Sequence, residues 1–386
     1  MSAGGGAAAG PRAVRGDLSP EHVAECDTGG QFDAVARLPE QLEAGYTRAV
    51  AALTGKPLVS ADRPNGVAVC GMGGSAIGGD VVRACLDGLP VPFQVVRGYE
   101  LPAWVSERTL VFAVSYSGNT EETLACLARA LARGCRPVCV ASGGRLTELA
   151  GRHDLPLVAV PAGLQPRASI GFLSTPIGAA LEVAGLAPGF DEQVAEAIEV
   201  TLELRAELAP EVADNDNEAK TVARRLLNCL PVVYGAGVTA PAARRWKGQL
   251  NENAKTPAFF NELPELDHNE LAGWATNPGV AGRAFLVLLD DPAGDERLRR
   301  RLALTAAVVQ PRVAGVTRIA ARGVLPLARV LSSAYVGDFT SLYLAVLYGV
   351  DPAPVAAIED LKARLAGGGG AAPSLTALRR SPASPS

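Results

Sequence analysis

The sequence predicts an α/β protein built from two units, each a mainly parallel sheet flanked by helices. Short apolar runs alternate with longer stretches of 3.6-residue apolar spacing, which is typical of βαβ units. The alternation stops over residues 170–230, which read as mostly helical, and then resumes. A chain of 386 residues with 48% apolar residues is large enough for two such units.

The first predicted unit starts with "GVAVCG" at residues 66–71, which is apolar throughout, as expected for a strand covered on both faces. A helix is expected over 120–133, where the apolar residues follow helical spacing. Further apolar runs predict strands at 92–96, 109–115, 136–141 and 156–160.

The second predicted unit starts with "PVVYGAG" at 231–237 and continues as a helix to about Glu252. Strands are expected at 285–291 and 312–318, with a helix between them at 295–308, and helices near 325–349 and 354–365 close the chain. The plan resembles that of the first unit, although the letters show no repeat. The division is a leading helix region within 1–34, units at 35–168 and 231–365, a helical connection at 169–230, and a tail at 366–386.

Composition excludes several classes of partner. The net charge of −4 leaves no basic excess for nucleic acid, and no continuous run of strongly apolar residues predicts a signal peptide or a membrane span. Seven cysteines, an odd number and several of them within apolar runs, favour buried thiols in a reducing cytoplasm. Residues 1–17 and the tail after Ala366 are rich in Gly, Ala, Ser and Pro, which predicts disorder.

A glycine-rich loop follows the first strand, in "CGMGGSAIGGD" at 70–80. Gly73, Gly74 and Ser75 open a helix whose unpaired N–H groups could hold a phosphate without a lysine or arginine. A dinucleotide-binding fingerprint is the alternative. It requires an acidic residue about 20 positions later, and the next strand ends instead at Arg97.

A second polar loop, "SYSGNTEET" at 115–123, follows another predicted strand. Ser115, Ser117 and Thr120 supply three hydroxyl groups at a strand-to-helix turn, where they could bind an anion or only cap the helix. Because both loops follow parallel strands, they can face one crevice, and this favours a phosphate ligand.

These motifs, together with "QPRASIGF", "NENAK" and "DHNE", resemble the bifunctional phosphoglucose/phosphomannose isomerase family, which has the sugar isomerase (SIS) fold. The resemblance covers roughly residues 35–365. It implies two SIS-type subdomains and the metal-independent interconversion of glucose 6-phosphate or mannose 6-phosphate with fructose 6-phosphate through a cis-enediol. It further implies that no cofactor is needed, and a homodimer. No cluster of His, Cys and carboxylate residues in the sequence has the spacing of a metal site.

The resemblance implies catalytic roles for two residues of the charged stretch 251–270. Glu252 in "NENAK" would be the carboxylate base, although most glutamates at helix ends are only solvated. His268 in "DHNE" would open the sugar ring and would be supplied by the neighbouring subunit, since imidazole titrates near neutrality. A structural role is the more common one for a lone histidine.

Three further positions follow from the resemblance. Arg167 would place a guanidinium beside the enediolate, or would otherwise be an ordinary loop charge. A small hydroxyl residue, Thr340 in preference to Ser341, would leave room for both C2 epimers. Lys362 would reach the substrate, or would face solvent on its helix.

Two other functions are compatible with parts of the sequence. A non-catalytic SIS module that binds a sugar phosphate would need only the two loops, and the intact "NENAK" and "DHNE" motifs argue against it. The isomerase half of a glutamine-dependent aminosugar synthase would need a glutaminase domain with an N-terminal cysteine, whereas this chain begins Met1-Ser2-Ala3.

Overall fold

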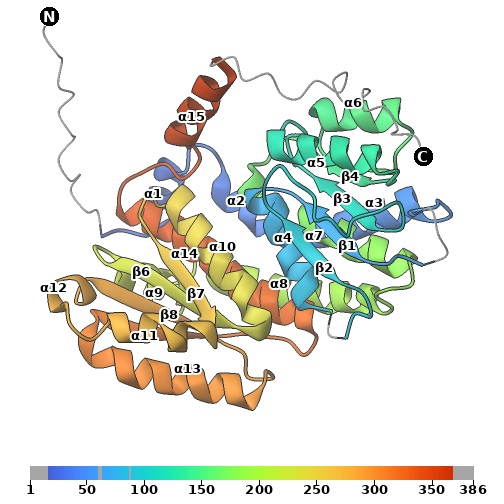
Figure 1. Ribbon diagram of the computed structural model, residues 1–386. Coiled ribbons are helices and arrows are strands. Elements are labelled where there is room, and N and C mark those ends of the chain that lie inside the picture. Colours follow the sequence, from blue (N-terminus) through green and yellow to red (C-terminus); the bar gives the residue numbers. More distant parts are fainter. Residues whose placement is uncertain (1–15, 60–62, 87, 368–386) are drawn as a thin grey trace, which may run out of the picture.

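The computed structural model describes residues 16–59, 63–86 and 88–367. Two sheets, each flanked by helices, make up the molecule (Figure 1). The first has the strand order β2-β1-β3-β4-β5 and the second has the order β7-β6-β8-β9, and every pairing is parallel. The predicted α/β architecture of two mainly parallel sheets is therefore confirmed.

The first sheet matches the apolar runs of the sequence closely. All residues of β1 and β3 are buried, because helices cover both faces of the sheet. The strands are β1 (Val67–Cys70), β2 (Phe93–Val96), β3 (Leu110–Val114), β4 (Val138–Ala141) and β5 (Leu157–Ala159). The helices between them are α4 (Gly73–Ala84), α5 (Glu121–Ala132) and α6 (Gly144–Arg152).

The second sheet contains a strand that the sequence did not predict. β7 (Phe259–Leu263) is an edge strand of five residues, and most of its side chains are partly or fully exposed. An edge strand needs no continuous apolar run, so residues 259–263 were not distinguished from the charged stretch around them. The other elements are β6 (Leu230–Ala236), β8 (Ala284–Asp290), β9 (Gly315–Ala320), α10 (Ala240–Glu252), α11 (Glu270–Gly273), α12 (Pro278–Ala281) and α13 (Glu296–Val309).

A layer of helices joins the two sheets. α14 (Pro326–Leu347) is long and apolar enough to span a membrane, yet nearly all of its residues are buried in the protein, so it is a core helix. Its neighbours come from distant parts of the chain, which makes one continuous core. The remaining helices are α1 (Pro20–Cys26), α2 (Gln31–Ala36), α3 (Leu38–Leu53), α7 (Ile170–Val183), α8 (Phe190–Leu208), α9 (Glu218–Leu226) and α15 (Ala356–Gly367).

The predicted disordered ends lie mainly outside the described residues. Where they overlap with them, Asp17 accepts hydrogen bonds from the backbone N–H and hydroxyl of Ser19, and α15 continues to Gly367. The expected burial of cysteines is confirmed for five of the seven: Cys70, Cys85, Cys126, Cys135 and Cys139.

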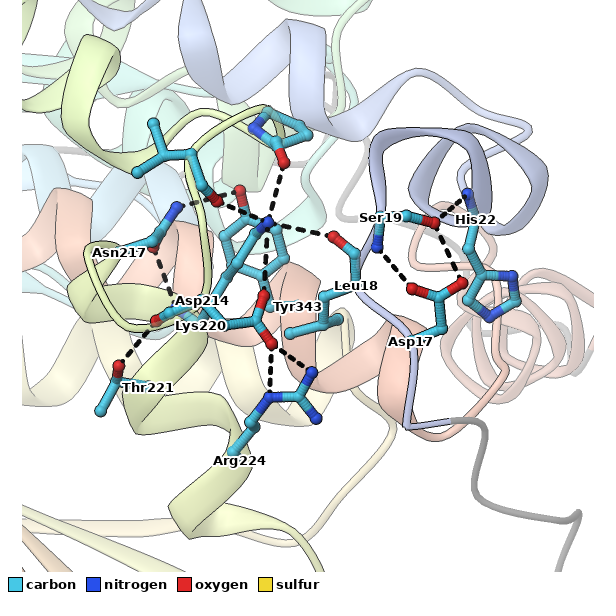
Figure 2. A network of polar contacts seen from close by, with 12 residues as sticks. Asp17, Leu18, Ser19, His22, Asp214, Asn217, Lys220, Thr221, Arg224 and Tyr343 are labelled. Carbon is cyan, nitrogen blue, oxygen red and sulfur yellow. Dashed lines mark hydrogen bonds and ion pairs between the residues drawn. The ribbon is translucent and has the colours of Figure 1, made fainter.

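A buried lysine fastens the N-terminal segment to the helical layer (Figure 2). Lys220 is 2% exposed, and its ammonium donates to the carbonyl oxygens of Leu18, Pro210 and Val212 at 3.0, 2.8 and 2.8 Å. Asp214 lies 3.6 Å from the same ammonium. Because three carbonyls use all three N–H donors, the buried charge is fully hydrogen-bonded.

Candidate active site

The two polar loops lie side by side at the carboxyl edge of the first sheet. β1 pairs with β2 on one side and with β3 on the other, so the chain reverses direction across the sheet between β1 and β3. Ligands of open α/β sheets bind at such switch points. A Cβ added at Gly71 would lie 3.1 Å from the carbonyl oxygen of Val114, which shows how closely the first loop approaches the end of β3.

The glycine-rich loop is held against the segment that carries Arg167. A Cβ at Gly74 would lie 2.7 Å from the carbonyl oxygen of Pro166, so a larger residue would push the two segments apart. Gly73 has φ of +52°, a conformation that glycine adopts without strain. Ser75 is buried behind the loop, in the first turn of α4.

Of the three hydroxyl groups of the hydroxyl loop, two contact each other and one is exposed. Ser115 is fully buried, and its hydroxyl lies 2.8 Å from that of Thr120, which precedes α5. Ser117 is exposed and accepts a hydrogen bond from the backbone N–H of Asn119 at 3.3 Å. Ser115 and Thr120 therefore shape the turn, and Ser117 presents its hydroxyl to solvent together with the N-terminus of α5.

Arg167 is buried between the two halves of the chain, and one Nη group of its guanidinium has only long polar contacts. Nε donates to Oδ1 of Asn253 at 2.7 Å, and Nη2 donates to the carbonyl oxygens of Pro352 and Ala353 at 2.8 and 2.6 Å. Its side chain is 5% exposed, and burial lowers its pKa from the usual value. Nη1 has only the long contact of 3.6 Å to Oε2 of Glu252 and one of 3.4 Å to Gln165.

Glu252 is the last residue of α10, and its side chain is 33% exposed. Its carboxylate therefore has one face towards the Nη1 group of Arg167 and another accessible to a ligand. Lys255 does not pair with this carboxylate. Its ammonium donates to the backbone carbonyls of Glu252 and Pro352 at 2.5 and 3.0 Å. Partial burial, and then the charge of Arg167, lower the pKa of Lys255 to about 8.

A buried polar network fixes the backbone of Arg167. Arg245 donates to the carbonyl oxygen of Arg167 at 2.7 Å and to Oδ2 of Asp338 at 2.8 Å. Gln249 donates to Oδ1 of the same aspartate at 2.7 Å. Burial raises the pKa of Asp338, while the charge of Arg245 and the amide of Gln249 act against that rise. Side chains of α10 and α14 thereby hold the backbone of Arg167 in place.

Asn253 extends this network to the guanidinium itself. It accepts from Nε of Arg167 and donates to the hydroxyl of Ser341 at 2.9 Å. Sequence reasoning did not find Arg245, Gln249 or Asp338. The available signal was the four-residue spacing of polar residues at 245 and 249 in α10 and at 253 directly after it, because residues four apart share one face of a helix.

The other predicted residues are distributed as follows. Ser341 touches the site through Asn253, whereas Thr340 is buried and its hydroxyl donates to the carbonyl oxygen of Val336 within its own helix. His268 is exposed, and within the described part of the chain its imidazole has no hydrogen-bond or ion-pair partner. Lys362 is exposed on α15.

The fold and the two loops define a protein of the sugar isomerase class. A solved structure of a hypothetical protein from Thermus thermophilus superposes with a TM-score of 0.68 at 19% identity, covering 91% of this chain and 93% of that one. Residues 215–365 match the family model described as the bacterial phospho-glucose isomerase C-terminal SIS domain.

Curated relatives give a narrower assignment. A bifunctional phosphoglucose/phosphomannose isomerase from Caldicellulosiruptor bescii is 41% identical over 340 residues, which is 87% of this chain and 98% of the relative. One of the same name from Aquifex aeolicus is 37% identical over 302 residues, 78% of this chain and 90% of the relative. The chain belongs to the bifunctional phosphoglucose/phosphomannose isomerase family.

Proposed function

We propose that this protein interconverts glucose 6-phosphate and mannose 6-phosphate with fructose 6-phosphate in the cytoplasm, with Glu252 as the base. The observation that carries the proposal is the placement of the Glu252 carboxylate 3.6 Å from the open Nη1 group of a buried arginine. The loop that contains Gly74 is packed against this same arginine segment.

The chemistry of each group fits one step of an aldose–ketose isomerisation. The phosphate of the substrate binds at Ser117, the N-terminus of α5 and the glycine-rich loop, with Ser75, Ser115 and Thr120 shaping these turns. Glu252 takes the proton from C2 of the open-chain aldose, the electron pair of that C–H bond forms the C1–C2 double bond, and the π pair of the C1=O bond moves to O1 to give a cis-enediolate. The proton of the O2 hydroxyl passes to O1, so that C2=O forms when C1 is protonated. The same carboxylic acid then returns the proton to C1.

Arg167 stabilises the negative charge that develops on the enediol oxygens. A guanidinium stays protonated at working pH, so it neither gives up a proton to the enediolate nor competes with Glu252 for one. Its fixed hydrogen bonds to Asn253, Pro352 and Ala353 hold it in place before the reaction starts, which is the preorganisation that electrostatic catalysis requires.

His268 completes the site from a second copy of the chain in this proposal. Its exposed imidazole has no partner among the described residues of its own chain, as expected for a group that acts in a neighbouring subunit. There it gives a proton to the ring oxygen as the C1–O5 bond breaks, while the C1 hydroxyl loses its proton to solvent and becomes the aldehyde. Lys362 is also exposed and is available to the phosphate or sugar of the partner's substrate.

The direct test is fructose 6-phosphate formation, measured separately from glucose 6-phosphate and from mannose 6-phosphate with a chelator present. We expect turnover of both aldoses at comparable rates, with no dependence on added metal. Turnover of one aldose would point to Ser341, which touches the Arg167 network, as the first residue to vary. Binding of all three sugar phosphates without turnover of any would favour the non-catalytic SIS module.

Mixing two inactive variants tests the shared site. Glu252→Gln and His268→Gln chains are each expected to be nearly inactive as homodimers. After exchange of subunits, half of the dimers are mixed and one of their two sites is intact, so about a quarter of the wild-type activity should return. No recovery in dimers proven to exchange would contradict donation of His268 across the interface.

A further inference from the structure

A cavity lies between the two units, on the carboxyl side of the second sheet. Its volume is about 910 Å³, within the range of small-molecule sites. Its walls include Asp80 of α4, Gly237 after β6, Arg244 of α10 and Asp290 at the end of β8. Among the described residues, the lining includes neither the hydroxyl loop nor Arg167 nor Glu252.

The position of this cavity repeats that of the candidate active site. β6 pairs with β7 on one side and with β8 on the other, so the second sheet has a switch point between β6 and β8, as the first has between β1 and β3. α10 follows β6 as α4 follows β1. Because open α/β sheets bind ligands at their switch points, the second edge is a candidate site in its own right.

The two equivalent helices run in opposite directions past each other. The first turn of α4 lies against Pro166, beside Arg167, whose side chain bonds the end of α10 through Asn253. At the other end, Arg244 near the start of α10 lies 3.7 Å from Asp80 in the second half of α4. The cavity is therefore the counterpart of the active site across an approximate two-fold relation between the units.

The loop after β8 differs chemically from the hydroxyl loop after β3. Asp291 is held by Arg329 at 2.8 Å, and the side chain of Asp295 accepts from the backbone N–H of Arg297 at the start of α13. Asp290 is different. Its carboxylate lies 3.7 Å from Nε of Arg299, which is too long for a hydrogen bond, so its acceptor positions remain open to a ligand.

Cationic groups on the other walls also keep unused donors. Arg244 lies 3.7 Å from Asp80, again beyond hydrogen-bond distance, and its guanidinium stacks over Phe260 at 4.8 Å. Arg299 is 44% exposed beside Asp290. Arg329 also lines the cavity, but its guanidinium is held by Asp291. The cavity thus offers donors for an anion next to a free carboxylate acceptor.

We propose that this cavity binds a phosphorylated sugar at a site separate from the catalytic one. The phosphate pairs with Arg244, and the sugar hydroxyls donate to Asp290, whose charge Arg299 balances, because a carboxylate accepts two neighbouring hydroxyl groups well and repels a phosphate. The substrates and product of the proposed function belong to this class, so either can occupy the site. The assignment extends the proposed function and does not depend on which residue is the base.

The test is a count of binding sites for fructose 6-phosphate on the full-length Glu252→Gln chain by titration calorimetry. We expect two sites per chain, and one after Arg244→Gln is added. Asp290→Asn should weaken only the second site, by about tenfold, the loss of a charged hydrogen-bond acceptor. Lys56→Gln, at an exposed lysine outside the cavity lining, should leave both sites unchanged.

One site in the parent chain, or two sites that persist in both Arg244→Gln and Asp290→Asn, would overturn the proposal. The side chains of Arg244 and Asp290 are partly exposed, so both variants should fold. Melting temperatures check this. If Glu252→Gln keeps its turnover, the assignment of the base fails. The variant would then equilibrate fructose 6-phosphate with the aldose phosphates during the titration. The number of sites measured for this mixture would still test the proposal.

Hydrogen exchange provides a second readout with the unaltered protein. Fructose 6-phosphate should slow amide exchange in residues 236–244 and 290–299 in addition to residues 115–123. Inorganic phosphate alone should protect 115–123 and 236–244, where Arg244 lies, and leave 290–299 unchanged, because its charge is repelled by Asp290 and it has no sugar hydroxyl groups to bring there. Protection confined to 115–123 with the sugar phosphate would contradict a second site.

Discussion

Lys220 and Arg167 are both buried cations that donate to backbone carbonyls. Lys220 uses all of its N–H donors in short hydrogen bonds, whereas Arg167 does not. The ammonium of Lys220 has three donors and three carbonyl partners (Figure 2). Arg167 uses Nε and Nη2 in short hydrogen bonds, while Nη1 has only contacts of 3.4 and 3.6 Å. The first group holds chain segments together, and the second faces a half-buried carboxylate.

This difference separates a structural charge from a reactive one. A saturated buried charge contributes to stability, because its removal leaves its partners without hydrogen bonds. A buried charge with open donors can stabilise negative charge that appears only during a reaction. The two residues should therefore respond differently to substitution, and the following predictions are ordered by expected size.

The largest effect is expected for Arg167→Gln. Loss of the positive charge beside the enediolate should lower kcat by about 10²–10³-fold, the typical cost of removing a transition-state donor. The KM for fructose 6-phosphate should change much less, because the phosphate binds at the loops. Steady-state kinetics measure both values. A variant with the wild-type kcat and a raised KM would contradict the assignment.

Lys220→Met should reverse this pattern. The carbonyl oxygens of Leu18, Pro210 and Val212 would lose their donor, which should cost about 3 kcal/mol of unfolding free energy. Thermal or urea unfolding measures this loss. The kcat of the folded fraction should stay within a factor of two, and a hundredfold fall would mean that the comparison with Arg167 is wrong.

Asp338→Asn tests whether the network below Arg167 positions it. The substitution keeps the side-chain shape but weakens the bond to Arg245, which holds the carbonyl of Arg167. We expect kcat to fall about tenfold with KM nearly unchanged, since a small displacement of a catalytic group is costly. Asp214→Asn, in the Lys220 network, is the control and should leave kcat unaltered.

The smallest effect concerns pH. Because the pKa of Lys255 is lowered to about 8, its ammonium loses its proton as pH rises through 8, and the bonds to Glu252 and Pro352 weaken. The wild-type kcat/KM should therefore decline several-fold above pH 8, and Lys255→Met should remove this step. A decline that persists unchanged in Lys255→Met would assign it to another group.

The same shift has a consequence for stability. The pKa of Lys255 is lower in the folded chain than its ordinary value of 10.5, so the folded state binds fewer protons between pH 8 and that value. This group alone should make the folded state more stable as pH rises through that window, and Lys255→Met should flatten the slope.

Much of the fold could be predicted because its strands are apolar on both faces. β1 and β3 are buried throughout, and their letters are continuous apolar runs. β7 escaped prediction because an edge strand with charged and exposed residues carries no such run. α14 was predicted as a helix near 325–349, and the structure shows that its apolar length reflects burial in the core.

The site was predictable only in part. Arg167 and Glu252 came from motifs, and the structure brings them to 3.6 Å from each other. The support from Arg245 and Asp338 could not be seen in the sequence, because residues 93 positions apart meet only when α10 packs on α14. The preference for Thr340 over Ser341 followed from adjacent letters alone. Only the packing shows that Ser341 reaches Asn253.

The most direct measurement of the central claim is hydrogen exchange from solvent into C2 of glucose 6-phosphate, catalysed by the Glu252→Gln chain. If Glu252 beside Arg167 is the base, exchange and isomerisation should both fall by about 10²–10⁴-fold, while binding of fructose 6-phosphate remains. Exchange at the wild-type rate in this variant would show that another group removes the C2 proton and would contradict the account.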